Sequence, residues 1–372
     1  MRTNLLLSSL LIAVGCWLIS TTDIHAQPAD RFYPGQLWLD TDGRPINAHG
    51  GGILRDGDTY YWYGEHKGEH TNGAFVGVTC YSSTDLYNWQ YRGVAFAVND
   101  SVGSPTERGC ILERPKVIYC KRTGKYIMYF HLELKGQGYR HANVGIAIAD
   151  SPVGPFRFVR NGRPNAKTWP VGYDKRLQKK TFPDTLKWWT PEWREAIKEG
   201  MFLHRDYERG QMARDMQLFV DDDGRAYHIF SSEDNLTIHI AELTDDYLHY
   251  TGRYTRVDPA GQNEAPTLFK RDGRYYMITS GCTGWAPNAA RLFTADNILG
   301  PWTRHPNPCR GEDSLTTFHS QGTFILPLAD GQLIFMADRW RPENPIDGRY
   351  IWLPVEWEDG LPVIRWKKEW KY

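Results

Sequence analysis

A short pattern of polar and hydrophobic positions occurs five times along the chain. Each copy is a polar turn that ends in glycine, followed by an aromatic or apolar run. Glycine supplies the positive φ of tight turns without a Cβ clash, and such a run has the composition of a β-strand. The copies are RDGDTYYWYGE (55–65), RTGKYIMYFH (122–131), DDGRAYHIFSS (222–232), RDGRYYMITS (271–280) and ADGQLIFMAD (329–338). Five matched copies predict a repeated β architecture.

A second predicted hairpin follows each of these copies. Its centre contains Asp, Gly or Pro and is often followed by Trp or Phe, as in SPVGPFRFV and ILGPWTRH. Two hairpins contain four strands, which is the number of strands in one propeller blade. The pattern therefore predicts an all-β fold, a five-bladed β-propeller. Long segments with the 3.6-residue period of helices are almost absent, and a β-sandwich would not repeat one turn-and-strand unit five times.

The longest interval between turn glycines separates Gly124 from Gly224 and predicts an insertion between blades 2 and 3, at about residues 160–212. Within it, TPEWREAIKEGM predicts a short helix that begins near Thr190, with Pro191 at the first helical position. The insertion is also rich in tryptophan: Trp169, Trp188, Trp189 and Trp193. These rings are expected either to wall a substrate cleft or to form a small hydrophobic cluster of their own.

The first 26 residues have the pattern of a bacterial-type secretory signal peptide. Arg2 provides a basic start, residues 5–19 are largely apolar, and Ile-His-Ala forms a cleavage site before Gln27. The apolar stretch is too short for a convincing membrane span. We therefore expect an exported protein, periplasmic or extracellular, with a single catalytic domain over residues 27–372.

The cysteines add little to this picture. Cys16 could carry a lipid anchor, but the apolar Trp-Leu-Ile sequence that follows it makes an outer-membrane lipoprotein the less favoured location. The rest of the chain has five cysteines without metal-ligand spacing, and an exported chain could form one or two disulfides among them. They are Cys80, Cys110, Cys120, Cys282 and Cys309.

Composition narrows the classes of partner. The 44 basic residues (Lys and Arg) balance the 44 acidic ones, so nothing indicates binding to nucleic acid or to an anionic membrane surface. Aromatic residues make up 14% of the chain, with 15 Trp and 21 Tyr. Most of these rings are expected to pack between strands. Flat aromatic faces also suit carbohydrates, so the composition is compatible with a sugar-active protein.

Candidate catalytic residues lie at the start of the strand that precedes each glycine turn, because the innermost strand of a blade runs along the central channel. Asp215 and Glu264 each lie nine residues before their glycine and so occupy the same place on neighbouring blades. Glu113 has the same relation to a following proline as Glu264, with a turn two residues longer. Gln321 takes this place in the fifth blade, and an Ala-His-Gly segment takes it in the first.

Carboxylates in three of the five copies indicate chemistry more than packing. Charged groups gathered at one channel mouth repel and lose hydration, which a protein tolerates mainly where they have a role. The alternative is that each pairs with a nearby arginine, such as Arg114 or Arg214, in an ion pair between blades. Paired carboxylates suggest glycosidic bond cleavage, in which an acid with a raised pKa protonates the leaving oxygen. In an inverting enzyme, another group roughly 6.5–9.5 Å away activates water.

At these residues the chain resembles glycoside hydrolase family 43, whose five-bladed propellers act on arabinose, xylose and galactose polymers. The segment NEAPTLFKRDGRYYMITSG is similar to the general-acid segment of the family, and RDMQLFVDDDGRAYHIFSSE to its pKa-modulating aspartate segment. This resemblance covers nearly all of the chain after the signal. It implies that Glu264 is the general acid, and that Asp215 raises the pKa of Glu264 and orients it.

The first blade departs from the pattern of the family. The family usually places its general-base aspartate there, whereas this chain has Ala-His-Gly at 48–50. Through AHGGGIL, LERPKVIY and SQGTF, the chain is most similar to the exo-β-1,3-galactanase group, which also lacks that aspartate. This likeness implies that Glu113 contacts the sugar and that Gln321 holds the attacking water. Because a neutral amide is a poor base, Glu113 and Gln321 are joint candidates for the general base.

Four further residues are candidates for binding the substrate. Trp285, Tyr63 and Trp340 are expected to offer stacking platforms for a galactose face, with strand packing as the alternative. His49 is expected to hydrogen-bond sugar hydroxyls or to fill the propeller axis.

Rim contacts and bound ions are less well indicated. Glu65, His66 and Glu233 follow strands near the channel and are candidate rim contacts. No cofactor is expected to be required. Some propellers of the family hold calcium or another ion on the axis, but no cluster of oxygen ligands in the sequence indicates a metal site.

The sequence therefore predicts an exported exo-glycosidase that removes galactose, with inversion, from the β-1,3-galactan of arabinogalactan-type glycans. The substrate would be a plant-type or microbial polysaccharide or oligosaccharide. A β-galactofuranosidase or α-L-arabinofuranosidase of the same fold is the alternative within the class. A non-catalytic carbohydrate-binding propeller is the alternative from another class, because the base aspartate of the first blade is missing.

Overall fold

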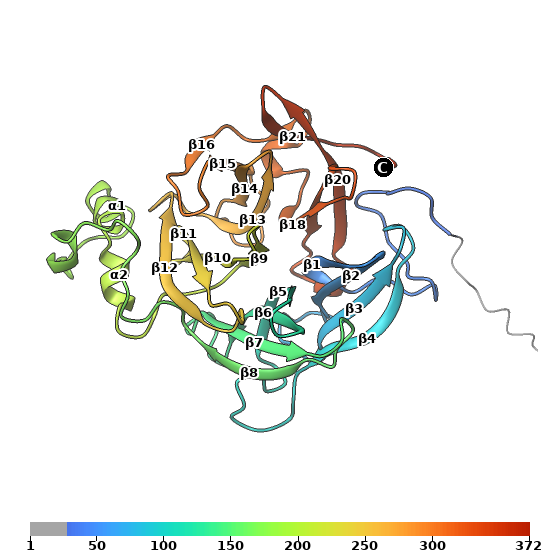
Figure 1. The fold of residues 1–372 in the computed structure, drawn as a ribbon, viewed down its shortest axis with the longest axis horizontal. Helices are drawn as coiled ribbons and strands as arrows, with labels where there is room; N and C mark the ends of the chain where they lie inside the picture. The colour runs from blue at the N-terminus through green and yellow to red at the C-terminus, as the bar shows by residue number, and fades with distance from the viewer. Residues whose placement is uncertain (1–27) are drawn as a thin grey trace, which may run out of the picture.

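The computed structural model describes residues 28–372, which form five sheets arranged around a central axis (Figure 1). Four sheets have four strands each, hydrogen-bonded in the order in which they follow in the chain, and the fifth has five. The all-β prediction and the five-bladed propeller are confirmed. The predicted signal peptide, with Cys16, lies outside the described residues.

The strands of the five blades follow one another along the chain. Blade 1 contains β1 (His49–Asp56), β2 (Thr59–Glu65), β3 (Gly77–Ser83) and β4 (Gln90–Ala97). Blade 2 contains β5 (Ile111–Cys120), β6 (Lys125–Glu133), β7 (Asn143–Ala149) and β8 (Arg157–Gly162). Blade 3 contains β9 (Met216–Val220), β10 (Ala226–Ser232), β11 (Thr237–Leu243) and β12 (Tyr250–Val257). Blade 4 contains β13 (Glu264–Arg271), β14 (Arg274–Ser280), β15 (Arg291–Ala295) and β16 (Thr303–His305). Blade 5 contains β17 (Cys309–Arg310), β18 (Gln321–Pro327), β19 (Leu333–Arg339), β20 (Arg349–Glu358) and β21 (Leu361–Arg365).

The glycine of each repeated turn lies between the innermost strand of a blade and the strand that follows it, as the sequence pattern predicts. The five glycines have φ angles from 61° at Gly57 to 83° at Gly331. A Cβ atom added at Gly57 or Gly331 would meet nothing within 4 Å. The backbone conformation, and not a lack of space, therefore requires glycine at these turns.

The innermost strands β1, β5, β9, β13 and β18 contact one another in a closed ring. The pairing of β1, β5, β13 and β18 with the next strand shifts register close to the start of each inner strand. Bulges of this kind re-aim side chains and are common beside active sites. At two of them a residue other than glycine adopts a positive φ, Arg114 (55°) and Ala265 (50°).

The hydrophobic core lies between the blades. Each of five buried clusters combines residues of two adjacent blades, so that the clusters complete a circuit. The cluster between blades 1 and 5 is the most aromatic, with Trp62 and Trp352 at a ring-centroid distance of 4.9 Å. Phe32 packs against Trp352, and its backbone pairs with that of Trp370 through hydrogen bonds of 2.9 and 3.2 Å. The two ends of the described chain therefore meet where the first and last blades join.

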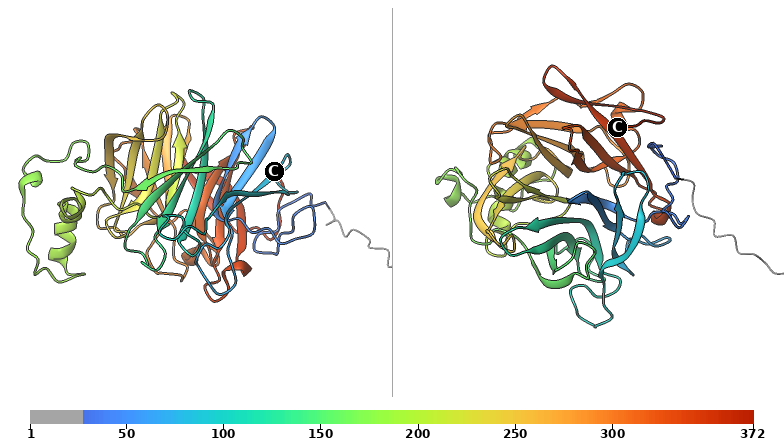
Figure 2. Two further views of the ribbon diagram at one scale, coloured as in Figure 1. Left: turned by 90° about the horizontal axis from the view of Figure 1, so that it is seen from below. Right: turned by 45° about the vertical axis from the view of Figure 1, so that its right-hand side comes forward.

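The insertion between blades 2 and 3 contains α1 (Pro191–Lys198) and α2 (Met201–Asp206), with a 3-10 turn η1 (Leu177–Lys179) before them. Thr190 caps α1 as predicted, because its hydroxyl accepts a hydrogen bond from the Trp193 N–H. Both helices stand out from the edge of the disc (Figure 2). Trp193 is buried in a small cluster together with Ile197, Phe202, Leu236 and Ala260. Trp193 therefore forms a separate hydrophobic cluster, whereas Trp188 and Trp189 pack beside it and remain more than half exposed.

Three smaller observations complete the fold. The five cysteines among the described residues are all free, so the disulfides that an exported chain could form are not present here. Two further 3-10 turns, η2 (Ser314–Thr316) and η3 (Pro345–Asp347), lie in loops of blade 5. None of the helices in residues 28–372 is long and apolar enough to cross a membrane.

Candidate active site

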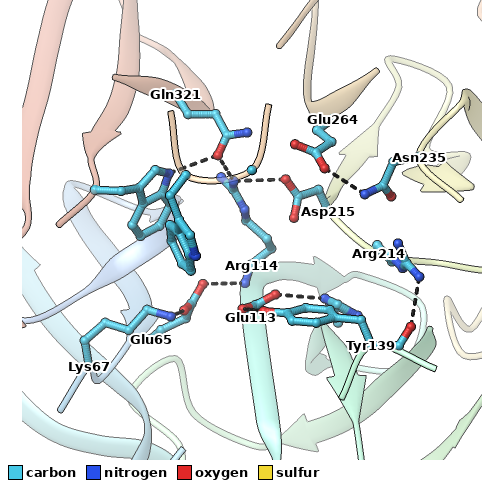
Figure 3. A pocket seen from close by; sticks show the side chains of 14 residues that line it. Glu65, Lys67, Glu113, Arg114, Tyr139, Arg214, Asp215, Asn235, Glu264 and Gln321 are labelled. Carbon is cyan, nitrogen blue, oxygen red and sulfur yellow. Dashed lines mark hydrogen bonds and ion pairs between the residues drawn. The ribbon is translucent and has the colours of Figure 1, made fainter. Parts of the chain in front are cut away.

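A pocket of about 350 Å³ opens at the mouth of the channel where the inner strands begin (Figure 3). This volume lies at the lower end of the roughly 300–1,000 Å³ that small-molecule sites occupy. The four predicted catalytic residues all line it, together with two of the predicted binding residues. The lining consists of Glu65, Lys67, Glu113, Arg114, His131, Tyr139, Arg214, Asp215, Asn235, Glu264, Gly284, Trp285, Gln321 and Trp340.

Glu264 is the first residue of β13, and its carboxyl group lies on the blade 4 side of the pocket. Its Oε1 accepts a hydrogen bond of 2.7 Å from the Asn235 amide. Burial and the negative charge of Asp215 raise the pKa of Glu264 to about 7, against the opposing effect of the Arg114 charge. A carboxylic acid that keeps its proton near neutral pH can act as a general acid.

Asn235 reaches Glu264 from a strained loop at the end of β10. Glu233, Asp234 and Asn235 all have positive φ, between 52° and 62°. Glu233 is fully buried and holds this loop through Arg256, at 2.7 Å, and through His239, at 2.8 Å. Glu233 therefore supports the loop from inside the blade. The expectation that it is a rim contact is wrong, because its side chain is not accessible at the pocket mouth.

Arg114 connects four blades beneath the pocket. Its guanidinium forms an ion pair of 2.9 Å with Asp215 and donates to the Gln321 side chain and, at 3.2 Å, to the Gly322 carbonyl. Its backbone N–H donates to Glu65 Oε1 at 2.8 Å. The ion pair between blades that was the alternative to a catalytic role for Asp215 is therefore present. It fixes the Asp215 carboxylate beside Glu264.

Glu113 lies on β5 and receives two hydrogen bonds. The His131 ring bonds its Oε2 at 3.1 Å, and the Tyr139 hydroxyl donates to its Oε1 at 2.7 Å. Burial by itself would raise the pKa of Glu113. The bonds from His131 and Tyr139 and the charges of His131 and Lys67 outweigh this effect and lower the pKa to about 2. Glu113 therefore carries a negative charge over the whole neutral range.

Gln321 begins β18, and its amide is held by three neighbours. Its Oε1 accepts from Arg114 and, at 2.9 Å, from the Trp340 indole N–H. Its Nε2 donates to the Ser280 hydroxyl at 2.8 Å. Arg114 and Trp340 can only donate, so the orientation of the amide is unambiguous. Both lone pairs of Oε1 are used, which leaves one N–H of Gln321 free for a ligand.

Glu65 and Lys67 form a buried ion pair of 2.5 Å on the blade 1 side. Burial raises the pKa of Glu65 although Lys67 opposes the shift. Glu65 thus lies in the pocket and is more deeply placed than a rim contact. His66 points away and lines a different cavity, next to Tyr81 and Tyr91.

The four predicted sugar-binding residues divide into two pairs. Trp285 and Trp340 line the pocket and meet edge to face, with their ring centroids 5.9 Å apart. Trp285 is 40% exposed, so one of its faces is accessible to a ligand. Arg114 lies 5.2 Å from the centre of the Trp340 ring and supports it from below.

The other two predicted binding residues, His49 and Tyr63, are buried and do not line the pocket. Tyr63 lies in the core between blades 1 and 2, and its hydroxyl donates to the Pro152 carbonyl. His49 stacks on Tyr350, and burial lowers the pKa of its imidazole to about 3. Stacking of Tyr63 on a sugar is therefore wrong. Of the two roles expected for His49, the structure favours packing near the axis.

The residues around the channel do not suit an axial calcium ion. Lys116 on β5 is buried between the inner strands, where its ammonium donates to the carbonyl of Gly50 at 2.8 Å. Burial and the Arg114 charge lower the pKa of Lys116 to about 7, and its amino group takes up a carbonyl oxygen that a calcium ion would need as a ligand. Within residues 28–372, no group of three His, Cys, Asp or Glu side chains is placed to hold a metal. We therefore derive no step through a metal ion.

Several pocket residues were not identified from the sequence. His131, Tyr139, Asn235 and Lys67 come from strand ends and from connecting loops outside the inner strands. The alternation of His131 and Glu133 at the end of β6 was the available signal, because two polar side chains on one face of a buried strand require partners.

Comparisons with known proteins identify relatives that cleave glycosidic bonds. The family model described as "Glycosyl hydrolases family 43" matches residues 191–362. A solved β-1,3-galactosidase of that family, in complex with galactodeoxynojirimycin, is 56% identical, with a TM-score of 0.90 over 92% of this chain and 100% of that one. A variant of the Phanerochaete chrysosporium exo-β-1,3-galactanase, solved with β-1,3-galactotriose, is 30% identical, with a TM-score of 0.75 over 92% of this chain and 68% of that one. The β-D-galactofuranosidase of Aspergillus niger is 33% identical, over 88% of this chain and 80% of that protein.

The electrostatics of the pocket predict the effect of Asp215→Asn on Glu264. The substitution removes a negative charge that raises the pKa of Glu264, and it leaves the Arg114 charge unopposed. The pKa of Glu264 should fall from about 7 towards the ordinary glutamate value of about 4.3. A carbon-detected NMR titration of the Glu264 carboxyl measures this shift. Asp223→Asn, in the turn after β9, changes the net charge equally and should leave the titration unchanged; an equal shift in both variants would contradict the assignment.

Proposed function

Because this chain belongs to glycosyl hydrolases family 43, and is therefore a glycoside hydrolase, we propose that it releases galactose from the non-reducing end of β-1,3-galactan with inversion at C1. The observation that carries this proposal is the buried Glu264 carboxyl, kept protonated near neutral pH beside Asp215. Membership of the family also decides against a propeller that only binds carbohydrate.

Glu264 supplies the proton in the first half of the proposed reaction. As the bond between C1 and the leaving oxygen breaks, the Glu264 proton passes to that oxygen, and the sugar ring acquires oxocarbenium character. Asp215 is held by Arg114 and cannot swing towards the sugar, so its charge acts through Glu264. The two carboxyl groups have different roles because their environments differ. Asp215 has an arginine as its partner, and Glu264 has an amide.

Water attacks C1 from the opposite side and gives up a proton. The free N–H of Gln321 can hold the water oxygen, but its Oε1 cannot take the proton, because Arg114 and Trp340 already fill it. The imidic acid form of Gln321 is excluded for the same reason, since the hydrogen of its O–H group would face one of these two donors. Glu113 is ionised and keeps a free lone pair on each oxygen. We therefore assign proton uptake to Glu113 and positioning of the water to Gln321.

The sugar is best assigned as galactopyranose. The structure that is 56% identical was solved with galactodeoxynojirimycin, and the galactanase neighbour with β-1,3-galactotriose. The pocket is small, and Trp285 offers an exposed ring for the apolar face of a hexose. A β-D-galactofuranosidase activity is the second candidate, because the Aspergillus niger relative carries that name.

The setting of the reaction is also a proposal. The signal-like first 26 residues support export to the periplasm or beyond, where polysaccharide fragments are met. Arabinogalactan-type glycans are the proposed source of the β-1,3-galactan.

Glu264→Gln should reduce the release of galactose from β-1,3-galacto-oligosaccharides by roughly 10²–10⁴-fold, because it removes the proton donor while keeping the shape of the side chain. Binding of β-1,3-galactobiose, measured by calorimetry, should persist. The wild type should be assayed on aryl galactopyranosides, galactofuranosides and arabinofuranosides. Activity restricted to furanosides would overturn the choice of sugar, and full activity of Glu264→Gln would overturn the choice of acid.

The assignment of the base predicts different responses to azide. Glu113→Ala should lose activity, and azide should restore turnover with formation of α-galactosyl azide, because the anion attacks without giving up a proton. Gln321→Ala keeps the proton acceptor but positions the attacking water less well, so its turnover should fall and azide should not restore it. Rescue of Gln321→Ala alone, detected by chromatography of the products, would reverse the two roles.

A further inference from the structure

A buried line of polar side chains runs from the pocket into blade 2. Glu113 at the pocket bonds Nδ1 of His131 at 3.1 Å, and Nε2 of the same ring bonds Glu133 at 3.0 Å. His131 is 1% exposed and Glu133 is 0% exposed. An imidazole with a carboxylate at each nitrogen must donate through both nitrogens, so this geometry selects the doubly protonated imidazolium.

Strand pairing produces this line. β5 and β6 are antiparallel, and their register places Glu113 directly opposite His131. Glu133 lies two residues after His131 on β6, so both side chains project from the same face of the strand. The bulge that follows Glu113 on β5 ends this register next to the pocket. The arrangement is therefore built into the sheet and does not depend on loop conformation.

Glu133 also fixes the second hydrogen-bond donor to Glu113. Its carboxylate accepts from the backbone N–H of His141 at 2.7 Å and from that of Ala142 at 3.0 Å. These bonds anchor the loop between β6 and β7, which carries Tyr139. The Tyr139 hydroxyl donates to Glu113 Oε1, the oxygen that His131 does not contact. One buried carboxylate thus holds both groups that hold Glu113.

The neighbouring blade provides a comparison. Glu233 lies nine residues after its turn glycine, as Glu133 does, and it also bonds a buried histidine, His239, at 2.8 Å. There the second partner is Arg256, and the other nitrogen of His239 contacts no carboxylate of the pocket. Burial lowers the pKa of His239, whereas the two carboxylates raise that of His131 to about 9 despite its burial. The buried ion pair of blade 3 therefore stabilises its blade without a bond to a pocket carboxylate. The bond from His131 to Glu113 is an additional feature of blade 2.

We propose that His131 and Glu133 are positioning residues, which keep the Glu113 carboxylate oriented and negatively charged so that it can accept the proton of the attacking water. This inference rests on the proposed function, and specifically on the role of Glu113. Neither residue touches the sugar in this account. His131 acts through Glu113, and Glu133 acts through His131 and the Tyr139 loop.

The charges around Glu113 give the sign of the pH effect. It faces His131 from β6, Tyr139 from the following loop, and Lys67 and Glu65 from blade 1, with Arg114 beside it on β5. His131→Gln keeps one hydrogen-bond donor but removes the positive charge. Burial then favours the neutral carboxyl group, so the pKa of Glu113 rises. Because Glu113 must be ionised to act, activity should be lost at a higher pH on the acidic side.

The test is the pH dependence of kcat/KM for release of galactose from β-1,3-galactobiose. The acidic limb should move upward by roughly 1–3 pH units in His131→Gln, and in the same direction by less in Glu133→Gln. The alkaline limb, set by Glu264, should stay in place. His239→Gln is the matched control: it removes an equally buried histidine of the next blade that makes no bond to Glu113, and it should leave the acidic limb where it is. An unchanged acidic limb in both blade 2 variants, or an equal shift in His239→Gln, would overturn the inference.

A second measurement uses only the wild type, so it does not require any variant to fold. In the wild type at pH 7.5, nitrogen-15 NMR of the histidine rings should show His131 doubly protonated and His239 neutral. A neutral His131 would overturn the inference even if galactose is released normally. Absence of galactose release by the wild type, with a doubly protonated His131, would instead count against the proposed function alone.

Discussion

Four carboxyl groups share one small pocket, and the need to neutralise them organises the rest of the site. Burial of a charge is tolerated only with a partner. Glu65 pairs with Lys67, Glu113 with His131, and Asp215 with Arg114. Glu264 has an amide, Asn235, as its hydrogen-bond partner, and in the part of the chain that the structure describes it forms no ion pair. The group without a cation keeps its proton, and this is the property that a general acid needs.

The propeller fold brings the residues of this pocket together from five separate stretches of the chain. The inner strands start at one mouth of the channel, so a residue at the start of each strand lies close to the others. Bulges near these starts turn individual side chains towards the pocket, and the positive φ of Arg114 belongs to one of them. The cores between the blades hold the strands in a ring, and the pairing of Phe32 with Trp370 closes that ring. The geometry of the site thus depends on contacts far from it.

Prediction from the sequence was sufficient for the features of the fold and of the site that follow the repeat. The turn glycines predicted the blades, and the offset from them found Asp215 and Glu264, with Glu113 and Gln321 close to the same offset. It was wrong for Tyr63, because strand alternation does not say which of two faces meets the axis and which meets the next blade. It missed Asn235 and Tyr139, which reach the pocket from loops whose conformation the strand pattern does not determine. The relation between Glu113, His131 and Glu133 required the register of β5 on β6.

Glu264 and Glu113 are proposed to act on opposite sides of the galactosyl bond. The most direct test is a proton NMR time course of the wild type on β-1,3-galactotriose, read before the released sugar equilibrates. Galactose should appear first as the α-anomer, together with β-1,3-galactobiose. Initial formation of β-galactose would show retention and would rule out these roles for Glu264 and Glu113, as would cleavage that yields no free galactose.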